Sequence, residues 1–360
     1  MHLLFSPWLL VAIAIPAWIK IRPRRSRREP RCPAGALDTA VSANYGPGRP
    51  AVPNRKPRNS GSSMNHPAGH RYDRLGLIRL TDRYLAALVA NDPSAVALAE
   101  GVRTVENLQR IKPGEGLWVT ASGGPAAFAI RVPDPQRQTA GFIGMMEQGS
   151  GPILLGLRLA TEDGVIVEAE HLFASGLAEA NLPNLQVPRP GLLAEIPPGQ
   201  RLPEEDLRAI GATYYDALVR NDSSLTPFAA DCERHENGLV TVGPGRGAPP
   251  PGSSFPMVPA ACAAQIDSKA FTYIADIDNR RVFAADPVTG LAMGLSMFRH
   301  PMDNVPYEII LADGTTTMHA PAFAPFDLPA AHIFKIGPDR RMHEIEAMGF
   351  TVPHGSPTGW

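Results

Sequence analysis

The sequence predicts an α+β protein in which one unit, helices followed by an antiparallel sheet, occurs twice in tandem. The first observation is an internal repeat, because residues 214–237 align without gaps on residues 84–107 at a shift of 130. The second is the order within each copy, where a segment of helical periodicity precedes several strand-like segments. The third is the turn signal Glu162-Asp163-Gly164, which joins two of these segments as a hairpin.

The repeat rests on more identities than unrelated segments of this length share by chance. Ten of the 24 aligned pairs are identical, namely Tyr84/Tyr214, Ala87/Ala217, Leu88/Leu218, Val89/Val219, Asn91/Asn221, Asp92/Asp222, Ser94/Ser224, Ala99/Ala229, Glu106/Glu236 and Asn107/Asn237. We therefore expect both copies to fold in the same way.

Each copy is expected to begin with a long helix. Residues 72–89 and 204–220 carry apolar side chains at helical spacing, and each segment is followed by an Asn-Asp pair. Asn and Asp side chains compete for backbone hydrogen bonds, which ends one helix and caps the next. A short helix is predicted over residues 225–230. Strands are predicted over residues 127–132, 139–147, 153–161 and 165–173, and over 232–236, 271–278, 281–285, 291–298, 330–336 and 342–348.

These elements divide the chain into two domains and two segments without periodicity. Residues 64–175 are predicted to form the first domain, residues 176–203 a Pro-rich linker, and residues 204–360 the second domain. The second domain has a long loop over residues 243–259 and an insertion over residues 299–329 with its own hairpin at Asp313-Gly314. Residues 1–63 are expected to be a disordered extension, or to precede the true start at Met64, with a possible membrane anchor over residues 3–21.

Composition and charge narrow the classes of partner. The 360 residues include 34 Lys and Arg against 35 Asp and Glu, and many of the arginines lie in the first 60 residues. The folded body is therefore acidic, which argues against a nucleic acid partner. Three cysteines exclude a disulfide framework, and Cys232 is expected to be a buried thiol. A cytoplasmic location is expected, and the alternative is an inner-membrane anchor through residues 3–21 with the body in the cytoplasm.

The helix pattern Tyr-x-x-Ala-Leu-x-x-x-Asp, the short helix and the acid on the first strand resemble a known group. They are similar to the SnoaL-like and ketosteroid-isomerase-like branch of the nuclear transport factor 2-like superfamily, over about residues 72–173 and 205–350. The resemblance implies two cone-shaped α+β domains, each with a pocket between its helices and its curved antiparallel sheet. It also implies sheet-to-sheet packing, so that the chain is an internal pseudo-dimer and need not associate further.

The resemblance assigns chemistry to the second copy. Tyr214 matches a tyrosine near a substrate oxygen, and Glu236 matches the carboxylate that moves protons in the isomerases. The acid is Glu rather than Asp, and the second acid of those isomerases has no match, so steroid isomerisation itself is not implied. The hypothesis is a cofactor-free isomerase, lyase, dehydratase or cyclase that acts on a small apolar molecule, with His235 as a proton relay. The alternative is a non-catalytic module for ligand binding or assembly.

Further residues are predicted to bind the ligand, and a purely structural role is the alternative for several of them. The predicted ligand-binding residues are Tyr84, Glu106, Asn107, Asn237, Phe271, Tyr273 and Met297. The Glu-Asn pairs could instead bind neighbouring backbone groups, and His235 could be a satisfied polar residue. The acids at residues 168, 170, 344 and 346 are predicted to face water. No metal is expected, because the histidines and acids lack the usual ligand spacing.

Overall fold

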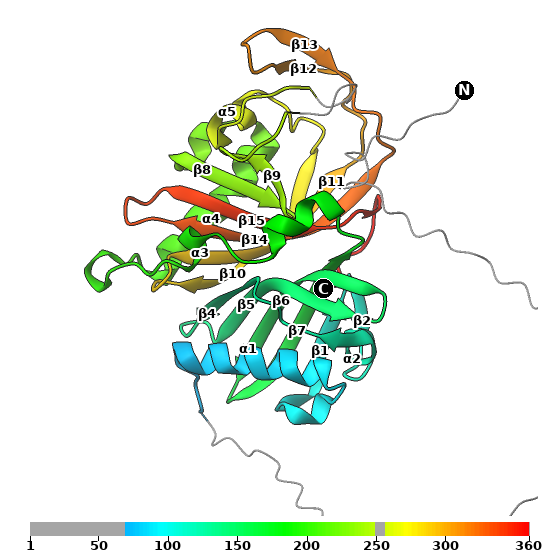
Figure 1. Cartoon of the computed structure of the whole chain (residues 1–360), viewed down its shortest axis with the longest axis vertical. Coiled ribbons are helices and arrows are strands. Elements are labelled where there is room, and N and C mark those ends of the chain that lie inside the picture. The colour runs from blue at the N-terminus through cyan, green and yellow to red at the C-terminus, as the bar shows by residue number, and fades with distance from the viewer. Residues whose placement is uncertain (1–68, 249–255, 360) are drawn as a thin grey trace, which may run out of the picture. The chain divides into compact units, whose positions relative to one another are not determined.

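The computed structural model describes residues 69–248 and 256–359, which form two curled seven-stranded sheets with few helices (Figure 1). The predicted extension over residues 1–63 and its possible anchor lie outside the described residues. Within the described ranges, no helix combines the length and hydrophobicity that crossing a bilayer requires. The fold is α+β, as the order of helical and strand-like segments predicts.

The first sheet follows one long helix. Its order is β2-β1-β7-β6-β5-β3, with β4 paired to β5, and β1 and β7 run parallel. The elements are α1 (Arg74–Val89), the 3-10 helix η2 (Pro93–Ala95), β1 (Leu98–Glu106), β2 (Gln109–Ile111), α2 (Leu117–Thr120), β3 (Ala121–Gly123), β4 (Ala129–Asp134), β5 (Thr139–Gln148), β6 (Gly151–Glu162) and β7 (Val165–Ser175). Helix α1 lies across one face of this sheet (Figure 1).

The second sheet follows another long helix. Its order is β10-β11-β14-β15-β8-β9, with β16 paired to β14, and β8 and β15 run parallel. The elements are α4 (Glu204–Arg220), the 3-10 helix η5 (Ser223–Leu225), β8 (Phe228–Glu236), β9 (Leu239–Val242), α5 (Cys262–Asp267), β10 (Asp276–Asp286), β11 (Leu291–His300), β14 (Phe326–Ile336), β15 (Met342–Gly349) and β16 (Val352–Pro353). The insertion forms a separate hairpin of β12 (Tyr307–Ile310) and β13 (Thr316–His319), around Asp313-Gly314 as predicted.

Local signals account for the helices and their ends. Asn91 and Asn221 take left-handed backbone angles, with φ of 55° and 49°, within two residues of the ends of the long helices. The carboxylates of Asp92 and Asp222 then accept hydrogen bonds from Ser94 N and Ser224 N at the starts of η2 and η5. Each long helix buries one apolar face on its own sheet, and the resulting clusters are the cores of the two halves.

Three predictions of secondary structure are wrong in detail. The short helix over residues 225–230 is only the single turn of η5, and Phe228 already belongs to β8, because Pro227 has no N–H with which to continue a helix. Segments 271–278 and 281–285 are not two strands, since β10 is continuous from Asp276. Neither sheet is wholly antiparallel, because each contains one parallel pair.

Contacts between the two sheets join the described residues into one compact unit. A buried apolar cluster contains residues of both sheets, including Ile143 and Leu154 of the first and Leu295 and Ile333 of the second. A Cβ atom at Gly141 would lie 2.5 Å from the sulfur of Met293 and 3.3 Å from its Cβ, so a larger residue at position 141 would require Met293 to shift. The two sheets therefore share a buried apolar cluster and approach each other closely at Gly141.

Buried ion pairs cross the same interface in both directions. Asp134, at the end of β4, accepts a hydrogen bond from Arg208 of α4 and another from Ala285 N at 3.0 Å. Asp286, at the end of β10, binds Arg74 of α1 through two hydrogen bonds of 2.9 and 2.8 Å. In each sheet, a carboxylate at the end of an edge strand thus binds an arginine on the long helix of the other half.

The segment predicted as a linker, residues 176–203, is ordered and packs on the second sheet. It contains η3 (Glu179–Leu185), α3 (Pro190–Leu193) and η4 (Pro198–Gln200), and Leu185 and Leu192 are buried in the cluster between the sheets. Proline restricts φ without creating periodicity, so this packing leaves no helix or strand pattern in the sequence.

Arg189 fixes this segment to three carboxylates on the second sheet. Its guanidinium lies 3.1 Å from Glu344, 3.3 Å from Glu346 and 3.7 Å from Glu233. Glu346 is 1% exposed, and burial raises the pKa of its carboxyl to about 8, although Arg189 acts in the opposite direction. The prediction that Glu346 faces water is wrong, and so is that for Glu170, which is buried and bound by Arg281.

Glu346→Gln is expected to flatten the pH dependence of stability. Between about pH 4.5 and 8 the unfolded chain has an ionised Glu346 while the folded chain keeps it protonated, so stability falls as pH rises through this window. We expect the unfolding free energy of the variant, relative to that of the wild type, to rise by roughly 1 kcal/mol for each pH unit within this window. Urea unfolding at several pH values measures this, with the exposed Glu308→Gln as the control. Parallel pH profiles for wild type and Glu346→Gln would contradict it.

The expected buried thiol at Cys232 is a disulfide with Cys262. The bond joins β8 to α5 across 30 residues of sequence, a separation from which proximity could not be inferred. Because disulfides persist mainly in oxidising environments, this bond does not favour the expected cytoplasmic location.

Candidate functional site

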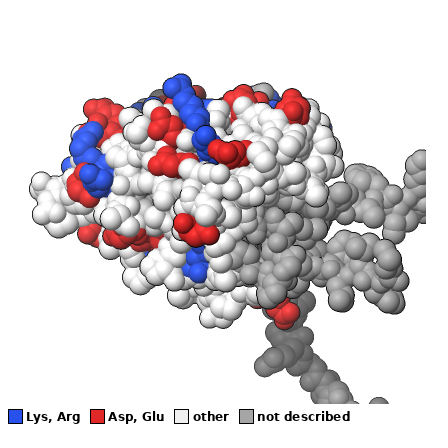
Figure 2. All heavy atoms as spheres, turned by 90° about the horizontal axis from the view of Figure 1, so that it is seen from above, with Lys and Arg blue, Asp and Glu red and all other residues white. Residues whose placement is uncertain are grey.

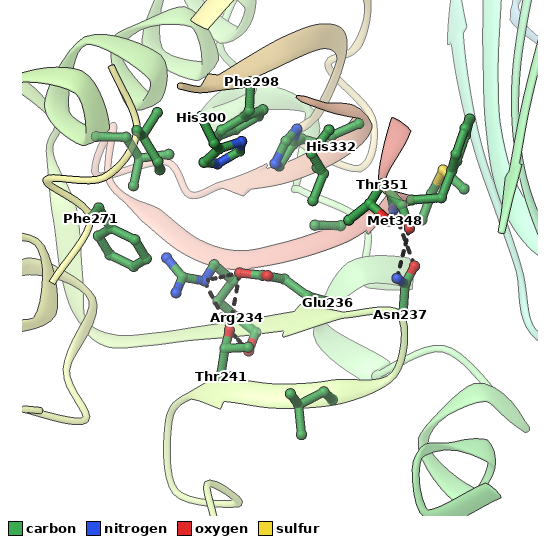
Figure 3. A pocket seen from close by; sticks show the side chains of 18 of the residues that line it. Arg234, Glu236, Asn237, Thr241, Phe271, Phe298, His300, His332, Met348 and Thr351 are labelled. Atoms are coloured by element: carbon green, nitrogen blue, oxygen red, sulfur yellow. Dashed lines mark hydrogen bonds and ion pairs between the residues drawn. The ribbon is translucent and has the colours of Figure 1, made fainter. Parts of the chain in front are cut away.

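The second sheet encloses a cavity of about 320 Å³ between α4 and the curl of its strands. This volume is near the lower end of the range of roughly 300–1,000 Å³ for ligand sites, which suits a small molecule. Its walls are mainly apolar and aromatic, and include Phe271, Tyr273, Phe298, Phe323 and Phe326. Because the sheet curls, side chains of β8, β11 and β14 all face this one space (Figure 3).

Arg234 is the central polar residue of the cavity. Its side chain is 4% exposed and comes from β8, two residues before Glu236 and therefore on the same face of the strand. Nε lies 2.9 Å from both Glu236 Oε1 and Thr241 Oγ1, as the dashed lines in Figure 3 mark. Nη1 donates to the Tyr214 hydroxyl at 3.2 Å and Nη2 to Gln265 Oε1 at 2.5 Å, and the guanidinium lies 5.1 Å from the centre of the Phe271 ring.

Glu236 and Tyr214, predicted as base and oxygen-binding residue, both line this cavity. The Glu236 side chain is 46% exposed, so it lies at the mouth of the cavity, where its charge is balanced by Arg234. Tyr214 is buried, and burial raises the pKa of its hydroxyl, so the phenol keeps its proton. Since its oxygen accepts from Arg234, the phenolic O–H remains available to donate.

Two histidines that the sequence did not single out also line the cavity (Figure 3). Burial lowers the pKa of His300 to about 4, and burial together with the charge of Arg234 lowers that of His332 to about 3. Both rings are therefore neutral at physiological pH. Nδ1 of His332 is buried and has no hydrogen-bond partner within the described part of the chain.

His235 lies apart from the cavity, although it precedes Glu236 in the sequence. Successive residues of a strand face opposite sides, and His235 Nε2 binds Glu233 at 2.6 Å beneath Arg189. It contacts neither Tyr214 nor the carboxylate of Glu236. The structure thus gives His235 a satisfied polar environment, which is the alternative that the sequence left open.

The other predicted ligand-binding residues divide between cavity and framework. Phe271 and Tyr273 line the cavity, in the segment before β10. Met297 packs in the cluster between the two sheets, whereas its neighbour Phe298 faces the cavity. Asn237 reaches the cavity wall, but its amide binds both backbone groups of Gly349, and Asn107 binds those of Phe173 in the same way. The two Asn residues therefore link the paired parallel strands of each sheet.

Tyr84 and Glu106 of the first half are joined through His171. Tyr84 Oη lies 2.9 Å from His171 Nε2, and His171 Nδ1 lies 3.1 Å from Glu106 Oε2. Glu106 Oε2 also accepts from Leu117 N at 2.9 Å, at the start of α2, and Trp118 of α2 packs edge-on against Tyr84 at 5.2 Å. In this half, α2 therefore packs against the Tyr-Glu pair.

Residues 69–248 and 256–359 contain no group of three or more His, Cys, Asp or Glu side chains placed to hold a metal ion. On the face in Figure 2, Lys and Arg lie beside Asp and Glu rather than forming a continuous basic patch.

Of the polar cavity residues that the sequence did not predict, only Arg234 could have been found from a sequence pattern. Arg234 lies two positions before Glu236 on a predicted strand, and this spacing places both side chains on one face. His300 and His332 carried no such signal, because only the pairing of β11 with β14 brings them together.

Comparisons with known proteins give weak likenesses. A family model described as "Domain of unknown function (DUF8021)" matches residues 200–349. No curated protein matches the sequence. Two solved structures, each described as a "putative polyketide cyclase", are similar. The one from Silicibacter sp. has 14% identity, covers 41% of this chain and 91% of its own, and gives a TM-score of 0.25. The one from Xanthomonas campestris pv. campestris has 15% identity, covers 40% of this chain and 90% of its own, and gives a TM-score of 0.24.

Proposed function

We propose that the chain is a tandem pair of SnoaL-like domains whose second domain is a cofactor-free enzyme. The enzyme moves a proton on a small apolar molecule bound in the second-sheet cavity, as an isomerase, a lyase or dehydratase, or a cyclase. The first domain is a supporting copy, and the two domains form an internal pseudo-dimer that needs no further copy.

The strand orders support the tandem arrangement. Taking β1, β2, β7, β6, β5 and β4 as counterparts of β8, β9, β15, β14, β11 and β10 gives the same pairings in both sheets, including the one parallel pair. The reciprocal ion pairs of Asp134 with Arg208 and of Asp286 with Arg74 fit the approximate two-fold symmetry of a dimer.

The bridge that Arg234 makes between Glu236 and Tyr214 carries the functional proposal. Its guanidinium holds a carboxylate at one end and a phenol at the other, against an aromatic cavity. Glu236 removes a proton from carbon or oxygen of the bound molecule. Arg234 and the phenolic O–H of Tyr214 stabilise the negative charge that then develops on a substrate oxygen. The low dielectric of the aromatic walls strengthens both interactions.

Glu236→Gln tests this role. Gln keeps the size and much of the hydrogen bonding of Glu but cannot accept the proton, so turnover should fall by about 10²-fold or more while folding is retained. Mass spectrometry of small molecules retained by the purified protein supplies the substrate, and stopped assays of its conversion supply the rate.

Glu106→Gln is the matched control, because Glu106 is the counterpart of Glu236 in the first domain. It should leave turnover within about twofold, since α2 packs against its site. If Glu106→Gln were inactive and Glu236→Gln active, the working domain would be the first. If neither change affected turnover, the enzyme assignment would fail.

One observation favours the second candidate function, a non-catalytic ligand-binding or assembly module. Glu236 is half exposed and paired with Arg234, whereas a strong general base is usually desolvated and free of a cationic partner. Tight retention of a molecule that the protein never converts would support this alternative.

A further inference from the structure

The fixed charges around the second-sheet cavity do not cancel. Among the described residues that line it, Arg234 and Arg246 are cationic and Glu236 is the single carboxylate. His300 and His332 add no charge, because both rings are neutral. The cavity walls therefore carry a net charge of about +1.

Of the two cavity arginines, Arg234 pairs with Glu236, whereas Arg246 has no carboxylate partner among the described residues. Its Nη1 donates to the carbonyl oxygens of Val258 and Pro259, both at 2.8 Å, which fixes the side chain at the loop that borders the cavity. Partial burial and the nearby charge of Arg234 both lower the pKa of its guanidinium. Two like charges that share a partly desolvated space repel each other, and a bound anion relieves this repulsion.

Another part of the cavity wall suits the body of an aromatic molecule. Phe298 and His332 lie 5.6 Å apart between ring centres, and His300 stacks on Phe326 at 4.1 Å. The buried Nδ1 of His332 offers one further polar contact, because it has no partner within the described residues. A ligand with a flat apolar body and one negative group at its end satisfies both regions at once.

We infer that the ligand of the second-sheet cavity is a small aromatic carboxylate whose carboxylate group is bound by Arg246. This inference rests on the proposed function only in its choice of cavity, and it adds a carboxylate group to the apolar molecule proposed there. Arg234 and Tyr214 then remain free to bind the reacting oxygen, and Arg246 selects the substrate by charge. A guanidinium suits this task, because its planar N–H groups match a carboxylate in a two-point contact.

Isothermal titration calorimetry with matched probes tests the inference. The probes are benzoate, trans-cinnamate and 1-naphthoate, each beside its neutral primary amide. At least one carboxylate should bind the wild-type protein about 10-fold more tightly than its amide. Arg246→Gln should remove this preference and leave the affinity of the amide within about twofold, whereas Arg246→Lys should retain part of it.

Removal of the negative charge of Glu236 should have the opposite effect on carboxylate binding. Glu236→Gln should raise the affinity for the same carboxylate, because it removes the single negative charge from the walls, and should leave amide binding unchanged. Arg340→Gln is the control for loss of an arginine, since Arg340 is 54% exposed and pairs with Asp206 away from the cavity. Thermal unfolding of each variant checks that it folds.

Equal affinity for carboxylate and amide would overturn the inference, and so would failure of all three carboxylates to bind at about 1 mM. These outcomes differ from a failure of the proposed function. Charge-dependent binding with turnover unaffected by Glu236→Gln would overturn the enzyme and keep the inference. A neutral natural substrate whose turnover requires Glu236 would overturn the inference and keep the enzyme proposal.

Discussion

Asp134→Asn should lower the free energy of unfolding by about 3–5 kcal/mol. Asp134 is fully buried between the sheets and binds Arg208, Ala285 N and Arg137 N. Asn is nearly isosteric but neutral, so the change leaves the buried guanidinium of Arg208 without a counter-charge. An uncompensated buried charge costs far more than the pair contributes when it is intact. Urea unfolding followed by circular dichroism measures the difference.

Asp82→Asn is the matched control, because Asp82 also binds an arginine, Arg131, but its side chain is 47% exposed. Exposed pairs of this kind contribute about 0–1 kcal/mol, so the control should unfold almost as the wild type does. If Asp134→Asn cost no more than Asp82→Asn, the ion pair between the sheets would not stabilise the fold as described.

Arg234→Gln should lower turnover of the retained substrate by about 10²–10³-fold. The change removes the positive charge that stabilises the developing oxyanion and disconnects Glu236 from Tyr214. Gln is shorter and neutral, and it cannot reach Thr241, Tyr214 and Gln265 together. Most of the loss should appear in kcat, since the charge develops only in the transition state.

Two comparisons separate this effect from general damage. Arg234→Lys keeps the charge but not the planar fork, so it should recover part of the lost rate. Arg340→Gln removes an exposed arginine and should leave kcat unchanged. Full activity of Arg234→Gln would show that the bridge between Glu236 and Tyr214 is not part of the catalytic apparatus.

Structural features that depend on residues close together in the chain could be predicted from the sequence. The periodicity of residues 204–220 and the Asn-Asp pair after it predict α4 and its end, because capping and helix-face burial act within a few residues. Glu162-Asp163-Gly164 predicts the β6–β7 hairpin for the same reason. The alternation of strand faces could also have separated His235 from Glu236 and joined Arg234 to it.

Residues that are distant in the chain but line the same cavity could be identified only from the folded structure. The cavity unites Arg234 of β8, His300 of β11 and His332 of β14, and the disulfide joins Cys232 to Cys262. The burial of Glu346 under Arg189 likewise depends on a segment that has no pattern of its own. These contacts follow from how the strands pair and how far the sheet curls. Both are set by the summed packing of side chains remote in sequence, which no local pattern encodes.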